Sequence, residues 1–205
     1  MDILKKIWSL QAKWSGEKPY FCISTKGLGG KGEWKDHYFK WPNLGDMEKI
    51  LQSYPTERYN LYFCPLPFSR PHRRREYVLG SGFLWADIDE TRPDKMKNPP
   101  HILWESSPGR WAGLWAIERW LSGSELEGYN KRMTYGTGSD KAGWDLTQVL
   151  RVPGTRNHKY KGSPEGSLTR VDLKGRLKLD DVPTEVSRVG EGRTREVYKK
   201  WEKKL

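Results

Sequence analysis

Cysteine and histidine are scarce in this chain, and their scarcity excludes several kinds of site. The two cysteines, Cys22 and Cys64, each follow a Tyr-Phe pair in a strand-like run, where a free cysteine usually packs as a small buried hydrophobic side chain. With no Cys-x-x-Cys pair and no cluster of Cys and His, a structural zinc site is not expected. Of the four histidines, His72 and His158 lie in basic loops, which favours solvated or phosphate-facing roles over metal ligation.

Long hydrophobic runs are also missing. No apolar run is long enough to span a bilayer, and residues 1–8 form an amphipathic pattern instead of the apolar region of a signal peptide. The sequence contains no internal repeat. We therefore expect a protein of the reducing cytoplasm that has no membrane partner.

Acidic residues are outnumbered by basic ones. Lys and Arg total 37 against 26 Asp and Glu, which gives a formal net charge of +11 and a pI near 9.6. Such an excess implies a polyanionic partner, of which nucleic acid is the commonest. An acidic membrane surface is disfavoured, because no long basic amphipathic helix is evident. Eleven tryptophans and ten tyrosines supply bulky core material and stacking surfaces.

The periodicity of the sequence predicts a mixed α/β chain of one domain, in which an N-terminal lobe precedes a central lobe. We predict helices over 1–14, 46–54, 125–135 and 193–205, and strands over 20–25, 34–41, 59–65, 101–106 and 113–117. Residues 144–150 are predicted to form a short helix or strand, and residues 168–173 and 176–179 a hairpin. The glycine-rich residues 26–32 match GxGxxG by letter, but they open no helix and are predicted to be a flexible hairpin loop.

The most informative stretch is a hydrophobic run, Phe83-Leu84-Trp85-Ala86, that leads into Asp87-Ile88-Asp89. Side chains alternate along a strand, so Asp87 and Asp89 point the same way, about 7 Å apart. Like charges on one face repel, and a cation held by both carboxylates removes that cost. Oxygen ligands of this kind suit Mg²⁺ or Mn²⁺. The structural alternative is a strand that ends in a polar turn, where Asp is common.

Residues 140–159 add a third carboxylate and two cations. Asp145 precedes an apolar run that ends at Arg151, and a Pro-Gly turn is expected to bring Arg151 and Lys159 to one side. Metals that clamp the reacting oxygens, with Arg and Lys on a triphosphate, are the requirements of nucleotidyl transfer. Taken alone, the segment would be an ordinary basic loop after a core element.

A basic loop stands directly before the Asp-x-Asp strand. It contains Arg73, Arg74 and Arg75. Its position beside that strand favours contact with the phosphates of a DNA template, and a solvated connection is the alternative.

Together with the middle stretch Glu105-Ser-Ser-Pro-Gly-Arg-Trp-Ala112, these segments resemble the catalytic core of the archaeo-eukaryotic primase superfamily, particularly its plasmid RepB-like and phage primase-polymerase branch. Members carry an Asp-x-Asp strand, a middle Ser-x-His-like motif, and a third acid followed by an Arg-x-Pro-Gly-type turn. The three motifs occur here in that order within residues 80–160. One departure is Ala112, which stands where many relatives have His or Gln.

The resemblance implies an α/β (α+β) primase-polymerase fold, with an RRM-like mixed or antiparallel sheet that bears the active site and a packed N-terminal lobe. Residues 1–180 would form this domain, with the lobe over about 1–78 and the motifs over about 79–160. Residues 181–205 would be a charged helix or linker. A helicase module or partner is expected beyond residue 205.

The resemblance also implies the activity of a DNA primase or primase-polymerase, which adds nucleotides from nucleoside triphosphates on a single-stranded DNA template during phage or plasmid replication in the host cell. Asp87, Asp89 and Asp145 would hold two Mg²⁺ or Mn²⁺ ions, with Asp140 as the rival third acid. The triphosphate would be gripped by Arg151 and Lys159, with Ser107 and Arg110 as weaker candidates.

Two alternatives stay open from the sequence. A non-catalytic replication-initiator domain on the same scaffold gains weight from Ala112, but three acids facing phosphates would serve no purpose in a DNA binder. A nuclease is the other alternative, because two-metal carboxylate sites also cut phosphodiesters. The pairing of Arg151 with Lys159, which suits a triphosphate, disfavours the nuclease.

Overall fold

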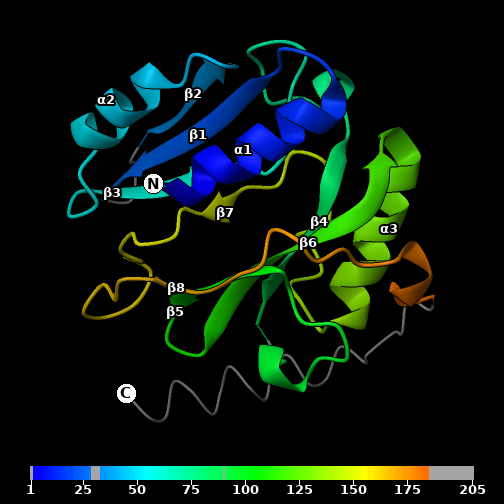
Figure 1. Cartoon of the computed structure of the whole chain (residues 1–205). Helices are drawn as coiled ribbons and strands as arrows, with labels where there is room; N and C mark the ends of the chain where they lie inside the picture. Colours follow the sequence, from blue (N-terminus) through cyan, green and yellow to red (C-terminus); the bar gives the residue numbers. More distant parts are fainter. Residues whose placement is uncertain (1, 29–32, 90, 185–205) are drawn as a thin grey trace.

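The computed structural model describes residues 2–28, 33–89 and 91–184 (Figure 1). These residues form three α-helices: α1 (Asp2–Ser15), α2 (Gly45–Ser53) and α3 (Gly123–Gly136). Their strands are β1 (Tyr20–Gly27), β2 (Trp34–Lys40), β3 (Tyr59–Phe63), β4 (Ser81–Ile88), β5 (Ile102–Ser107), β6 (Arg110–Leu121), β7 (Leu150–Arg151) and β8 (Ser167–Val171). Within the described ranges, no helix is both long and apolar enough to cross a membrane.

The first sheet has the strand order β2-β1-β3-β7, and every neighbouring pair is antiparallel. Helix α1 lies across one face of this sheet (Figure 1) and buries its apolar stripe there. Trp8 of α1 stacks on Phe21 of β1 and on Phe39 of β2, with ring centroids 5.0 and 6.2 Å apart. The opposite face of the sheet carries Trp34, Asp36 and Tyr62.

The second sheet has the order β4-β6-β5-β8 and is also antiparallel throughout. Helix α3 packs beside β4 (Figure 1), where the side-chain oxygen of Asn130 accepts a hydrogen bond from the Trp85 backbone nitrogen at 2.8 Å. The middle motif forms the tight turn between β5 and β6, as predicted. Gly109 has φ +75° in this turn, a backbone conformation that glycine adopts without strain.

Two sets of contacts join the sheets into one core. The buried Gln11 of α1 donates to the Pro65 carbonyl after β3 and to the Ser81 hydroxyl in β4, at 3.0 and 2.7 Å. Further along, Trp104 of β5 packs against Phe63 of β3, with ring centroids 5.9 Å apart. The indole nitrogen of Trp104 also donates to the Arg151 carbonyl in β7 at 3.0 Å.

Two element predictions are wrong. Residues 144–147 form turns and the strand β7 begins only at Leu150, because the Asp145 carboxylate accepts hydrogen bonds from Thr147 and closes a local turn that competes with helix or strand. Residues 168–173 do not form a hairpin with 176–179, since β8 pairs with β5 and Leu177 bridges to Ile117 of β6. A local turn signal cannot reveal that both segments have distant partners.

The other helices and strands lie within a few residues of their predicted positions. The predicted final helix over 193–205 and most of the glycine-rich hairpin loop fall outside the described residues. The predicted domain boundaries stay predictions.

Candidate active site

The Asp-x-Asp motif lies at the end of β4 and opens into a polar pocket of about 230 Å³ at the junction of the two sheets. Both carboxylates are only partly exposed. Side chains from β3, β4, the β5–β6 hairpin and the segment after α3 surround the pocket. They are Tyr62, Asp87, Asp89, Ser106, Ser107, Arg110, Ala112, Asp140, Val149, Arg151, Asn157, Lys159 and Tyr160.

Charges of both signs act on Asp87. Burial raises its pKa to about 7, and the carboxylates of Asp89 and Asp140 add to this rise. The positive charges of Arg110 and Lys159 oppose the rise. Two other acids and two cations therefore act on Asp87 around the same small volume.

Asp140 and Asp145 have different surroundings. The Asp140 side chain lines the pocket, and its backbone nitrogen donates to the Asp87 carbonyl at 3.0 Å. The Asp145 carboxylate accepts from the Thr147 nitrogen and hydroxyl at 2.7 and 2.6 Å. Asp145 is not among the described residues that line the pocket. The geometry thus favours Asp140, the rival in the sequence analysis, as the third acid.

The β5–β6 hairpin contributes Ser107 and Arg110. A guanidinium nitrogen of Arg110 lies 2.6 Å from the Asp89 carboxylate, and the group also lies over the Tyr160 ring. Ser107 is 2% exposed, and its hydroxyl has no hydrogen-bond partner among the described residues. Because a buried hydroxyl without a partner is costly, this group is suited to a bound polar ligand. Ala112 lies opposite Asp87 in the strand register and lines the pocket.

Arg151 is only 9% exposed and is held by a network of neutral partners. One terminal nitrogen donates to Asn60 Oδ1 and the Arg156 carbonyl, at 2.9 and 2.8 Å. The other donates to the Tyr62 hydroxyl and Asn157 Oδ1, at 3.2 and 3.0 Å. Burial lowers the pKa of the guanidinium. Arg151 therefore borders the pocket as a fixed charge, and both of its terminal nitrogens already donate hydrogen bonds within the protein.

Lys159 lies on the same pocket, and its side chain is exposed. The segment around the Pro-Gly turn thus brings Arg151 and Lys159 together, although their interactions differ. Sequence reasoning did not identify Tyr62, Asn157 and Tyr160, which also line the pocket. The only signal for Asn157 and Tyr160 is their position beside Lys159. His158, expected in a solvated or phosphate-facing role, instead bonds the Thr56 carbonyl and the Ser163 hydroxyl.

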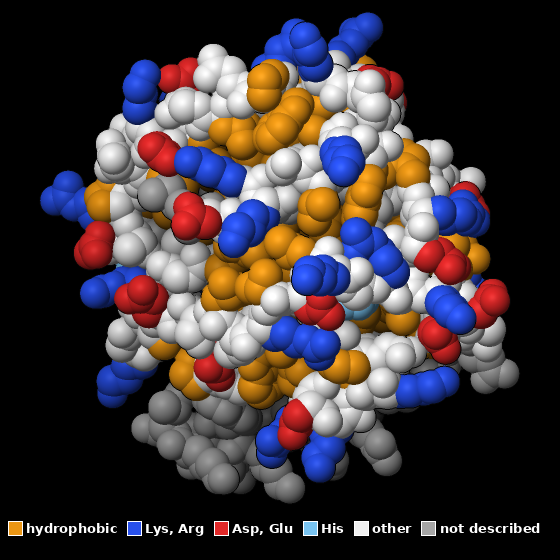
Figure 2. All heavy atoms as spheres, in the orientation of Figure 1, with side chains coloured by type: hydrophobic (Ala, Val, Ile, Leu, Met, Phe, Trp, Pro, Cys, Tyr) orange, Lys and Arg blue, Asp and Glu red, His pale blue; other side chains and the backbone are white. Residues whose placement is uncertain are grey.

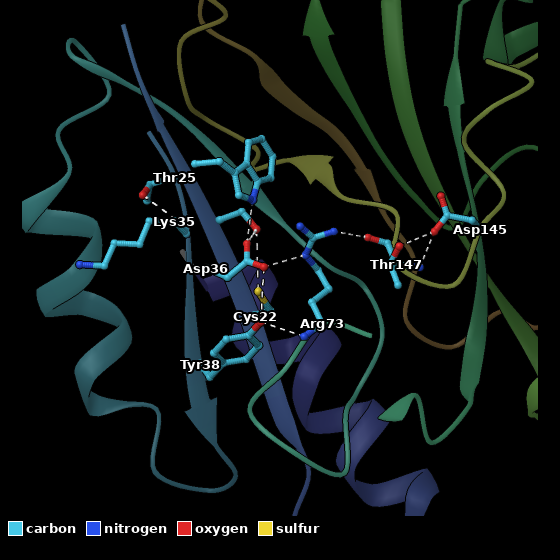
Figure 3. Close-up of polar contacts among 10 residues, drawn as sticks. Cys22, Thr25, Lys35, Asp36, Tyr38, Arg73, Asp145 and Thr147 are labelled. Carbon is cyan, nitrogen blue, oxygen red and sulfur yellow. Dashed lines mark hydrogen bonds and ion pairs between the residues drawn. The ribbon is translucent and has the colours of Figure 1, made fainter. Parts of the chain in front are cut away.

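The three loop arginines do not form one uniform basic surface. Figure 3 shows Arg73 between Asp36 and Thr147; it pairs with the Asp36 carboxylate at 3.1 Å and donates to the Thr147 carbonyl at 2.7 Å. Arg75 pairs with Glu127 of α3. Arg74 is the most exposed of the three, with Glu76 3.7 Å away. Arg73 therefore joins the first sheet to the segment that leads into β7, and contact of this loop with DNA stays a prediction.

The donor set of the pocket fits a divalent cation in its chemistry. Carboxylate oxygens are the ligands of Mg²⁺ and Mn²⁺, and burial, with Asp89 and Asp140 nearby, raises the pKa of Asp87, so a cation beside these acids would be favourable. Among the described residues, however, no three His, Cys, Asp or Glu side chains converge on a single metal position. Since Arg110 pairs with Asp89, a cation would have to displace this guanidinium to use both acids of the motif.

One face of the molecule carries many basic side chains. On the face shown in Figure 2, Lys and Arg side chains are spread from edge to edge, with Asp and Glu among them. Positive charge on this face is therefore not confined to a single patch.

The chain matches the family model of the RepB DNA-primase N-terminal domain over residues 73–185, more than half of its length. Its structure is similar to that of primase RepB′, with a TM-score of 0.62 and 20% identity. That likeness covers 98% of this chain and 66% of RepB′, so the chain spans just under two thirds of that protein.

Two further structures are similar. The AEP domain of the cyanophage S-2L primase-polymerase has a TM-score of 0.62 and 8% identity, covering 87% of this chain and 95% of that domain. The catalytic domain of primase RepB′ in complex with initiator DNA has a TM-score of 0.57 and 17% identity, covering 98% and 99%. No curated protein sequence matches the chain. These likenesses confirm the predicted primase-polymerase fold.

Proposed function

The chain belongs to the family of RepB DNA-primase N-terminal domains, and from this premise we propose that it catalyses template-directed nucleotidyl transfer on single-stranded DNA in plasmid or phage replication. The substrates would be nucleoside triphosphates. The observation that carries the proposal is the pocket in which Asp87, Asp89 and Asp140 lie with Arg110 and Lys159. A site for DNA alone would not gather carboxylates where phosphates must approach.

Asp87 and Asp89 are the residues that would hold a divalent cation, and Asp140 replaces Asp145 in our proposal as the third acid. When bound, Mg²⁺ or Mn²⁺ would supply charge neutralisation at the reacting phosphate and orient the reacting oxygens. The Asp87 carboxyl must lose its proton to act as a ligand. Because its pKa is raised to about 7, this requirement falls within the physiological range.

The basic residues of the pocket would act on the triphosphate in different ways. Lys159 has an exposed ammonium that can move onto phosphate oxygens. Arg151 would stabilise negative charge from a fixed position, because one terminal nitrogen already donates to Asn60 and Arg156 and the other to Tyr62 and Asn157. The Ser107 hydroxyl would donate to an oxygen of the nucleotide and so gain the partner that it lacks.

A non-catalytic initiator domain is the second candidate, and the Arg110–Asp89 ion pair is the observation that favours it. If that ion pair persisted with nucleotide present, Arg110 would neutralise the negative charge of Asp89 and leave it unable to hold a cation. Under the catalytic proposal, Asp89 would hold the cation and Arg110 would pair with a phosphate of the nucleotide instead.

The deciding experiment is primer extension with a 5′-labelled primer on a single-stranded template, with Mg²⁺ or Mn²⁺ and, as control, with EDTA. Elongation that needs the metal and is lost in Asp89→Asn supports the proposal. Binding without elongation would favour the initiator domain, and shortening of the labelled strand would indicate a nuclease.

A further inference from the structure

The face of the first sheet that points away from α1 carries aromatic side chains next to the pocket. In the strand register, Ser24 of β1 pairs with Asp36 of β2 and with Tyr62 of β3, while Lys26 pairs with Trp34. Paired residues share a face of a sheet, as do residues two apart along a strand. Trp34, Asp36 and Tyr62 therefore lie together on the face opposite the one that α1 covers.

These side chains form a layered stack that starts at the pocket. The Arg151 guanidinium lies 4.9 Å from the centroid of the Tyr62 ring, and the Tyr62 ring is stacked on Trp34 with centroids 5.3 Å apart and planes at 26°. Tyr62 lines the pocket, whereas Trp34 is 40% exposed. The stack thus runs from the pocket to the surface of the protein.

The exposed indole is held in a fixed orientation. Its ring nitrogen donates to Asp36 Oδ1 at 2.9 Å, and the Arg73 guanidinium lies 5.7 Å from its centroid. A single exposed apolar residue needs no explanation in general. Trp34 differs because it is oriented by a hydrogen bond, supported by a second ring and continuous with the pocket.

We propose that Trp34, supported by Tyr62, is a stacking platform for a base of single-stranded DNA that passes the pocket. The inference rests on the proposed function and goes beyond it by assigning a position to a base of the DNA. A flat aromatic surface accepts any base, because every base has a π-face, and so it suits a template of arbitrary sequence. Lys26 is exposed directly opposite Trp34 in the register and supplies the positive charge that a flanking phosphate requires.

The test compares two 12-nucleotide strands of equal charge, oligo-dT and a strand made only of abasic sites, in fluorescence anisotropy titrations. We expect Trp34→Ala to weaken oligo-dT binding by about tenfold and to leave binding of the abasic strand unchanged, since stacking requires a base. Trp34→Leu should behave like Trp34→Ala because it keeps apolar cover without a ring, and Trp34→Phe should retain most of the affinity. Leu168→Ala, at another exposed apolar residue on β8, is the matched control and should change neither titration.

An equal loss of affinity for both strands would overturn the platform and would mean that Trp34 only supports the charged residues around it. Full affinity of Trp34→Leu for oligo-dT would also overturn the platform. Primer extension separates this inference from the proposed function. In primer extension, Trp34→Ala should raise the KM for the template, because the platform binds DNA. A wild-type protein that binds oligo-dT better than the abasic strand but never extends a primer would overturn the catalytic proposal and leave the platform standing.

Discussion

At the scale of single residues, the charge state of Asp87 links the site to the stability of the fold. Its pKa is about 7 in the folded protein and near 3.8 when exposed, so the folded state holds a proton that the unfolded state has lost between these values. The stability contributed by this group is therefore fully present below about pH 4 and is lost as the pH rises through about 7.

We predict that Asp87→Asn abolishes primer extension and stabilises the metal-free protein, more at pH 8 than at pH 5, because the amide cannot ionise. The pKa shift corresponds to about 4 kcal/mol, and solvent screening at this partly exposed carboxyl reduces the expected gain at pH 8 to about 2 kcal/mol. Urea unfolding at the two pH values in EDTA measures it. A gain that does not depend on pH would contradict the assignment.

The two candidate third acids provide a matched pair of variants. Asp140→Asn should lower kcat for extension by about 100-fold and reduce the rise in Tm that Mn²⁺ causes, since it removes a carboxylate from the pocket. Asp145→Asn should stay close to wild type in both assays, because an amide oxygen accepts the same hydrogen bonds from Thr147. The reverse result would restore Asp145 as the third acid.

At the scale of elements, Arg73 connects β2 to the segment before β7, because it pairs with Asp36 and donates to the Thr147 carbonyl. Both side chains are about one-fifth exposed, and Arg73 reaches the Thr147 carbonyl from there (Figure 3). The arginine loop is therefore partly a structural connection. Reversing the charge of all three loop arginines together would mix unfolding with loss of DNA contact.

We predict that Asp36→Asn lowers the free energy of unfolding by about 2 kcal/mol, because Arg73 is left without its counter-charge in a half-buried position. Arg74→Ala, in the same loop but exposed, should change it by less than about 0.5 kcal/mol. Urea denaturation monitored by circular dichroism compares the two. Equal effects would mean that the Asp36–Arg73 contact stabilises little.

The elements also show where sequence reasoning succeeds. The Asp-x-Asp strand and the Ser-Pro-Gly turn were predicted because their alternation and turn residues are local signals. The turns around Asp145 and the pairing of β8 with β5 were not predicted, since the first depends on a side chain competing for backbone hydrogen bonds and the second on a partner about 65 residues away. The same limit applies to the third acid: the place of Asp145 before an apolar run is visible in the sequence, but the contact of Asp140 with β4 is not.

At the scale of the whole molecule, the excess of 37 basic over 26 acidic residues predicts salt-dependent DNA binding. The sequence alone could give the sign of this charge, but not which cations are free to meet a phosphate. The structure makes that distinction within the arginine loop.

We predict that Arg74→Glu weakens oligo-dT binding and lowers the slope of log K against log salt by about one, because a phosphate contact is lost. Lys49→Glu makes the same change in net charge on α2, whose lysine is well exposed, and should leave the slope nearly unchanged. Anisotropy titrations between low and moderate salt measure both. Identical slopes for the two variants would show that net charge alone governs binding and that the Arg74 loop is a connector.

The strand β7 has only two residues, and it pairs with β3, which lies almost ninety residues earlier in the chain. Trp104 of the second sheet holds the same strand through the Arg151 carbonyl. Closing such a long loop costs entropy that only non-local contacts repay, so we expect this junction to form late in folding. A partly folded chain can therefore attract DNA by charge before it can select a nucleotide, and recovery of activity during refolding should coincide with the slowest phase of native structure formation.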